Sequence, residues 1–154
     1  MSCCLQNFIR TFWAEGRYLT MGKVESVPLY DLPWVPYEDY MEAQLVEVTS
    51  GKPSMLVIRF PANSSEDQHL HVHPISDRAI TVLQGTGEFL VVRDGKLLRH
   101  RIAPGNQIWM PRDVVHNFIA GPEGLLVESH HLPFVPFDDP QCFVRWEGEL
   151  VCDG

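Results

Sequence analysis

Three histidines combine the residue type and the spacing that bind a transition metal. His71 and His73 form a His-x-His pair, and because side chains along a strand alternate between its faces, both imidazoles point to one side. His116 ends the stretch GNQIWMPRDVVH, which opens on Gly105 and contains Pro111. A third imidazole from another strand would complete a half-shell of nitrogen ligands with open positions, the pattern of a working rather than a sealed metal site. We therefore expect His71, His73 and His116 to hold one divalent transition metal ion.

These residues resemble the two motifs of the cupins, a family of small antiparallel jelly-roll barrels. The first motif is His-x-His, then Glu, then Gly; the second is Gly, five residues, Pro-x-Gly, two residues and His. The matching positions are His71, His73 and Gly85 in the first motif and Gly105, Pro111 and His116 in the second. The resemblance is specific over residues 70–118. It implies an all-β, cupin-type antiparallel jelly-roll barrel that binds Fe, Mn, Zn or Ni.

The chain departs from the cupin pattern at the position of the glutamate ligand. Counting back from Gly85, this position is occupied by Arg78, with Asp77 beside it. A guanidinium is a fixed cation and cannot ligate a metal. Three interpretations stay open: a three-histidine site in which Arg78 binds a substrate carboxylate, a site in which Asp77 is the fourth ligand, or a surface Arg78 paired with Asp77.

Two smaller features bear on the same site. His69 extends the pair to His-x-His-x-His, so it is either a further ligand, a support for one, or an exposed residue at the start of the strand. Asp113 replaces the glycine that follows the proline of the second motif, which is expected to alter only a turn.

The elements that would position the histidines are short strands separated by turn signals. The pair Asp94-Gly95 is a strong two-residue hairpin signal. Many short strands at this spacing predict a sandwich or barrel. The expected strands cover residues 44–49, 55–60, 89–93, 96–102, 107–110, 114–120 and 125–131.

Arms rich in proline and aromatic residues are expected at both ends of the barrel. Residues 1–42 form the N-terminal arm, 43–132 the barrel and 133–154 the C-terminal arm. Apolar residues from Leu5 to Trp13 have helical spacing and predict a short helix. The arms hold more aromatic side chains than a small barrel can bury, so they predict a homodimer.

Composition excludes several classes of function. A formal charge of −8 and the lack of a basic patch argue against nucleic acid as a partner. No apolar run approaches the roughly 20 residues that span a bilayer, and the first residues do not resemble a secretory signal, so we expect a cytoplasmic protein with no membrane partner. Neither a Gly-x-Ser-x-Gly nucleophile motif nor a glycine-rich phosphate loop is present.

The expected function is metal-dependent chemistry on a small, anionic organic molecule bound in the mouth of the barrel. Cupins that bind Fe(II) by three histidines include dioxygenases, so the resemblance favours a dioxygenase in which Arg78 orients the substrate. Two alternatives stay open. The first is a non-redox isomerase, lyase or cyclase that uses the metal as a Lewis acid. The second is a non-enzymatic ligand-binding cupin, because fold alone does not give function.

Overall fold

The computed structural model describes residues 18–20, 34–37, 41–47, 55–64, 69–135 and 139–151. The regular structure of these residues is entirely β-strand, as the sequence predicts. In chain order the strands are β1 (Tyr18–Thr20), β2 (Val35–Tyr37), β3 (Met41–Glu47), β4 (Met55–Phe60), β5 (His71–Val72), β6 (Asp77–Arg93), β7 (Lys96–Ile102), β8 (Gln107–Met110), β9 (His116–Leu132) and β10 (Val144–Arg145). The helix expected from Leu5 to Trp13 lies outside the described residues.

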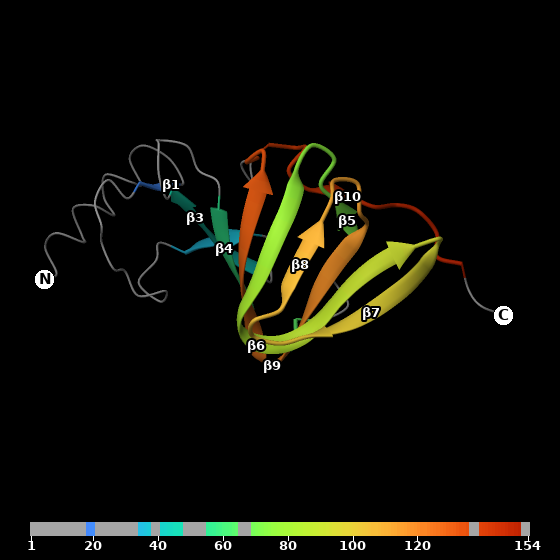
Figure 1. Ribbon diagram of the computed structural model, residues 1–154, viewed down its shortest axis with the longest axis horizontal. Coiled ribbons are helices and arrows are strands. Elements are labelled where there is room, and N and C mark those ends of the chain that lie inside the picture. The colour runs from blue at the N-terminus through green and yellow to red at the C-terminus, as the bar shows by residue number, and fades with distance from the viewer. Residues whose placement is uncertain are drawn as a thin grey trace, which may run out of the picture.

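Two long strands, β6 and β9, form the frame of the molecule. They pair antiparallel from Asp77 opposite Leu132 to Val91 opposite His116. Their register shifts at Gly85, and there the sheet folds back on itself as a V (Figure 1). One arm of the V holds β8, β4 and the strands that pair with β4. The other arm holds β7, β5 and β10.

The core lies between the two arms. Residues of alternating position on β6 and β9 point inward, so that Ile80 and Val82 on one arm face Phe89 and Phe118 on the other. The ring centroids of Phe89 and Phe118 lie 5.1 Å apart, so these side chains join β6 and β9 in the arm of the V that holds β7. The remaining buried members of this cluster are Phe60, Ile102, Met110, Ala120, Leu125 and Val127.

The sequence predicts several strand boundaries correctly. Strands β4, β7 and β8 begin and end at the expected residues. Asp94 and Gly95 both have positive φ, 54° and 76°, as the predicted tight hairpin requires. The expected strands 114–120 and 125–131 are instead one continuous strand, β9. The pairing is antiparallel except between β1 and β3, and the described hydrogen bonds leave the sheet open rather than closed into a full barrel.

No helix in the described part of the chain is long and apolar enough to cross a membrane.

We expect alanine to destabilise the protein more at Gly85, in the bend of β6, than at Gly105. Gly85 has a φ of 78°, and a Cβ there would overlap the carbonyl oxygen of Gly124, whereas Gly105 has a φ of 89° with open space around it. Gly85→Ala is expected to lower the free energy of unfolding by about 3–5 kcal/mol. The control Gly105→Ala carries only the backbone penalty of about 1–2 kcal/mol. Urea unfolding of the two variants measures the difference, and equal midpoints would contradict this account of the bend.

Candidate metal centre

The three histidines predicted from the sequence lie together at the open end of the V. Strand pairing places His71 of β5 directly opposite His116 of β9, and His73 follows β5 by one residue. The ring centroids lie 4.2 Å apart for His71 and His116, 4.9 Å for His73 and His116, and 5.1 Å for His71 and His73. Each ring offers one nitrogen, and these nitrogens lie within 4.8 Å of one another. The group is compact enough to hold a single ion.

A backbone carbonyl fixes the proton of each ring. His71 Nδ1 bonds to the carbonyl of His69 at 3.2 Å, His116 Nδ1 to that of Val114 at 2.9 Å, and His73 Nδ1 to that of Cys142. A carbonyl oxygen only accepts, so in the neutral ring Nδ1 carries the hydrogen and Nε2 keeps its lone pair. Metal-binding histidines show the same arrangement, in which one ring nitrogen donates to a carbonyl and the other faces the ion.

Burial keeps the three imidazoles neutral. It is the largest cause that lowers the pKa of His116 to about 4 and the pKa of His73 to about 2. Burial also lowers the pKa of His71 well below its ordinary value, and the neighbouring His116 and His73 lower it further. Neutral imidazole is the form that ligates metals, so the donor set fits a divalent transition metal.

Arg78 is buried at the same open end, with 2% of its surface exposed. Its charge contributes to the lowered pKa of His71, His73 and His116. Its Nη2 lies 3.5 Å from the carbonyl oxygen and 3.7 Å from the sulfur of Cys142. The position of the usual cupin glutamate therefore faces the site, but it carries a cation.

Two interpretations left open by the sequence are wrong. Asp77 lies on the outer side of β6, where its carboxylate accepts hydrogen bonds from the backbone N–H of Arg112 at 2.8 Å and from Arg112 Nε at 3.2 Å. The Arg112 side chain also lowers the pKa of Asp77. Alternation along the strand turns neighbouring residues to opposite faces, so Asp77 is neither a ligand nor the partner of a surface Arg78.

The two smaller sequence features also have a clear place. The His69 side chain is exposed, and it is the backbone carbonyl of His69 that supports His71. Asp113 has a φ of 64°, the left-handed conformation that the family's glycine would supply at this turn. The turn is therefore kept, and the Asp113 backbone N–H donates to the carbonyl of His73 at 3.2 Å.

Sequence reasoning missed three residues around the site. Cys142 and Phe143 lie within residues 133–154, the expected C-terminal arm, and the sequence assigned them no role at the site. The Phe143 ring stacks on His71 with a centroid distance of 3.9 Å. His131, to which the sequence assigned no role, is 3% exposed and lies opposite Arg78 in the β6–β9 register. No sequence signal places His131 inside, because its burial follows from its register with Arg78.

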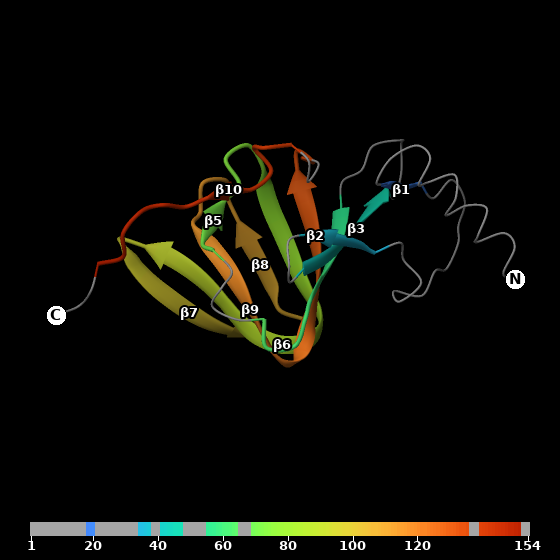
Figure 2. The same ribbon diagram turned by 180° about the vertical axis from the view of Figure 1, so that it is seen from behind.

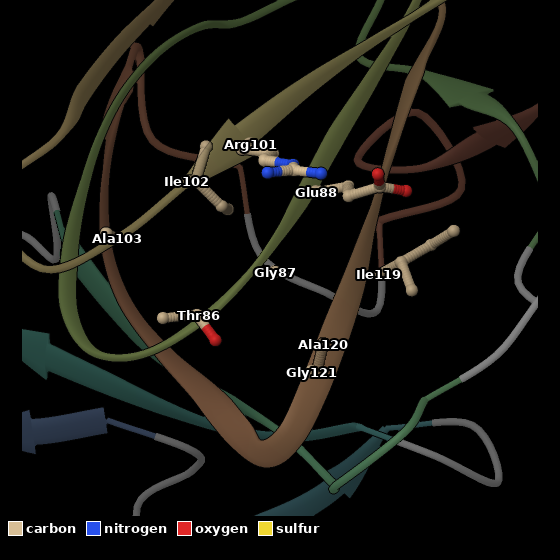
Figure 3. A pocket seen from close by; sticks show the side chains of 9 residues that line it. All are labelled: Thr86, Gly87, Glu88, Arg101, Ile102, Ala103, Ile119, Ala120 and Gly121. Atoms are coloured by element: carbon tan, nitrogen blue, oxygen red, sulfur yellow. The ribbon is translucent and has the colours of Figure 1, made fainter.

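A separate pocket of about 420 Å³ lies away from the histidines. It covers the outer face of β6, β7 and β9 near the bend, where Glu88, Arg101 and Ile119 lie in one register row (Figure 3). Glu88 is paired there with Arg99 at 2.8 Å. No residue of the three-histidine group lines this pocket, so it is not part of the candidate metal centre.

Comparison with solved structures identifies the architecture. The capsular polysaccharide assembling protein CapF of Staphylococcus aureus superposes with a TM-score of 0.61 at 12% identity, over 75% of this chain and 32% of CapF. Hydroxypropylphosphonic acid epoxidase of S. wedmorenis, in complex with fosfomycin, gives 0.57 at 16% identity, over 72% of this chain and 60% of the epoxidase. The fold is cupin-like. Drosophila melanogaster CENP-C bound to CAL1 superposes with a TM-score of 0.55 at 12% identity, over 68% of this chain and 84% of the CENP-C chain.

These likenesses are of fold alone. The chain spans about a third of the length of CapF. No family model matches the sequence, and no curated protein matches it. The cupin-like fold accounts for why the two histidine motifs, far apart in the sequence, meet at one end of the sheet.

Because the three histidines are neutral in the folded protein, we expect the free energy of unfolding to fall at acid pH. In the metal-free protein His116 has a folded pKa of about 4. An unfolded histidine titrates near its ordinary value of about 6.5, so the unfolded chain binds more protons below that pH. Stability is therefore complete above pH 6.5 and is lost as the pH falls toward 4, by at least about 2 kcal/mol between pH 7 and pH 5.

Urea unfolding of chelator-treated protein at several pH values measures this loss. The variant His116→Gln removes one titrating group and should show a shallower dependence on pH. A free energy of unfolding that does not change between pH 7 and pH 5 would contradict the burial of neutral imidazoles.

Proposed function

We propose that this chain is a metal-binding cupin that acts on a small, anionic organic molecule. The observation that carries the proposal is the convergence of three histidines, two buried and one partly buried, each with Nδ1 bonded to a backbone carbonyl. This arrangement keeps three nitrogen lone pairs available without protonation at neutral pH. Three imidazoles with open positions suit Fe, Zn or Ni, and Mn is retained as a further candidate.

Within this class we propose a three-histidine Fe(II) dioxygenase. A divalent iron bound at the site would supply redox chemistry with dioxygen as well as Lewis acidity. His71, His73 and His116 would hold the ion, and Arg78 would bind and orient a carboxylate of the substrate by a bidentate contact. Apolar residues below the site, among them Ile80 and Met110, would exclude water from the reacting groups.

The charge of Arg78 supports an anionic substrate. A divalent ion near a guanidinium is repelled, and the repulsion is strong where both are buried. An anion bound between the ion and Arg78 would offset this repulsion. A site that pairs three neutral ligands with one fixed cation therefore favours substrates with a carboxylate or a similar anionic group.

Two other functions remain candidates. A non-redox isomerase, lyase or cyclase would use the same residues with the metal as a Lewis acid only. A non-enzymatic binding role gains support from the likeness to CENP-C, a protein whose structure was solved with a protein partner.

A cytoplasmic location and a homodimer also stay as proposals. The homodimer is supported by two exposed apolar side chains, Trp109 on β8 at 76% and Leu132 at the end of β9 at 55%.

The first prediction from this proposal concerns metal content. Protein purified without a histidine tag is expected to hold about one divalent ion per chain, measured by mass spectrometry of the metals. Alanine at His71, His73 or His116 should each remove most of the metal, because two remaining imidazoles bind weakly. The control His100→Ala, at an exposed position on β7, should leave the content unchanged.

Oxygen uptake then separates the candidate functions. Iron-loaded protein with a panel of small carboxylates should consume oxygen if the dioxygenase proposal is right. Metal binding without oxygen uptake would favour the non-redox or binding alternatives. A wild-type protein that binds none of the four metals, or histidine variants that bind them as well as wild type, would contradict the proposed function.

The second prediction concerns Arg78→Met, which removes the charge and keeps most of the apolar bulk. Zinc affinity should rise by about tenfold, because a nearby cation no longer repels the ion. Small carboxylates should bind the zinc-loaded variant more weakly, by about 2–5 kcal/mol if the lost contact is fully desolvated. Arg112→Met, on the outer side at Asp77, is the matched control and should change neither. Calorimetry measures both affinities, and an Arg78→Met variant identical to the control would remove Arg78 from the site.

A further inference from the structure

The C-terminal strap, defined as residues 139–146, crosses the open end of the V. Figure 2 shows the red C-terminal chain passing over this end beside β5 and β10. The strap docks through one antiparallel strand pair, β10 with β5, in which Val144 lies opposite Val72 and Arg145 opposite His71. The backbone N–H of Trp146 adds a hydrogen bond to the carbonyl of Leu70 at 2.8 Å. The strap is therefore held beside the candidate metal centre by backbone hydrogen bonds to the strand that carries His71.

Two residues of the strap touch the metal-binding histidines directly. The carbonyl of Cys142 accepts the Nδ1 hydrogen of His73, and the same carbonyl lies 3.5 Å from Nη2 of Arg78. The ring of Phe143 stacks on His71 at an interplanar angle of 20° and meets His73 edge-on at 6.5 Å. The strap thus contacts two of the three rings and the guanidinium.

The three histidines differ in where their supporting carbonyl comes from. His71 and His116 each bond through Nδ1 to the carbonyl of the residue two positions earlier in their own chain segment, so the acceptor of each Nδ1 hydrogen is local. The partner of His73 is Cys142, 69 residues away. The orientation and the proton position of His73 therefore depend on the docking of a separate segment.

We propose that the C-terminal strap is a positioning element of the metal centre, which orients His73 through the Cys142 carbonyl and His71 through the Phe143 ring. The proposal rests on the proposed metal-binding function. Groups that orient metal ligands change metal affinity about 10–100-fold when they are removed. Undocking the strap would let the His73 ring rotate, would release its fixed proton, and would open the site to water. Tight metal binding then requires the docked strap.

One matched pair of variants tests the docking. Trp146→Pro removes the N–H that bonds to Leu70, whereas Trp146→Ala keeps this N–H and removes only the ring. In full-length protein titrated with zinc, the dissociation constant should rise about 10–100-fold in Trp146→Pro and should change much less in Trp146→Ala. Release of zinc to an excess of chelator should be faster in the proline variant alone.

A second pair tests the ring contact and does not disturb the backbone. Phe143→Ala should weaken cobalt binding and should shift the visible absorption of the cobalt-loaded protein, because His71 is no longer held at one angle. Phe143→Tyr should restore both, since its ring can stack in the same place. Leu150→Ala, at an exposed position beyond the strap, is the control and should behave as wild type.

The outcomes separate this proposal from the one on which it rests. If wild type binds metal and both Trp146→Pro and Phe143→Ala keep its affinity and cobalt spectrum, the strap has no positioning role and the metal centre stands. If wild type binds no metal, both proposals are wrong. A loss of affinity in Phe143→Ala that Phe143→Tyr does not restore would also overturn the role of the ring. Thermal unfolding of the metal-free variants shows whether each is folded before it is titrated.

Discussion

Three hydrogen bonds from imidazole Nδ1 to backbone carbonyls set the chemistry of this molecule. They hold the proton of each ring on Nδ1, and burial lowers the pKa of each ring, so that three lone pairs are available at neutral pH. Each of these bonds depends on backbone that the sheet holds in place. The pairing of β5 with β9 sets His71 against His116, and the strap supplies the acceptor for His73. The strand pairing therefore determines both where the three imidazoles lie and which carbonyl each of them bonds to.

The bend of the sheet brings the charged side chain of Arg78 to the same end of the molecule as the three histidines. Because β6 folds back at Gly85, its first residues face the histidines from the opposite arm, and Arg78 is the inward-facing one. The cation lowers the pKa of all three imidazoles, which helps to keep them neutral, but it also opposes a divalent ion. The anionic ligand that we propose would offset the repulsion between the ion and Arg78. The substitution that departs from the cupin pattern thus narrows the class of molecules that the site would accept.

Much of this arrangement follows from local sequence, and the rest depends on distant contacts. The His-x-His pair, the hairpin at Asp94 and Gly95, and the bounds of β4, β7 and β8 are set by alternation and turn chemistry within a few residues. The three interpretations of Arg78 could not be decided from sequence, because the choice depends on which face of β6 pairs inward and on the bond between Asp77 and Arg112.

The contacts of the strap also could not be predicted from the sequence. Nothing near Cys142 or Phe143 in the sequence marks them as neighbours of His71 and His73, since the contact is made by a two-residue strand pair between segments some seventy residues apart. The burial of His131 was not predicted either, because it follows from the register of His131 with Arg78 and not from its own neighbours in the sequence.

The most direct measurement of the central claim is X-ray absorption at the zinc edge of stoichiometrically loaded full-length protein. The account predicts a first shell that contains three imidazole nitrogens at about 2.0–2.1 Å, with the outer-ring scattering typical of histidine. A first shell with fewer than three imidazoles, or one containing sulfur at about 2.3 Å, would contradict the assignment of His71, His73 and His116 as the ligands.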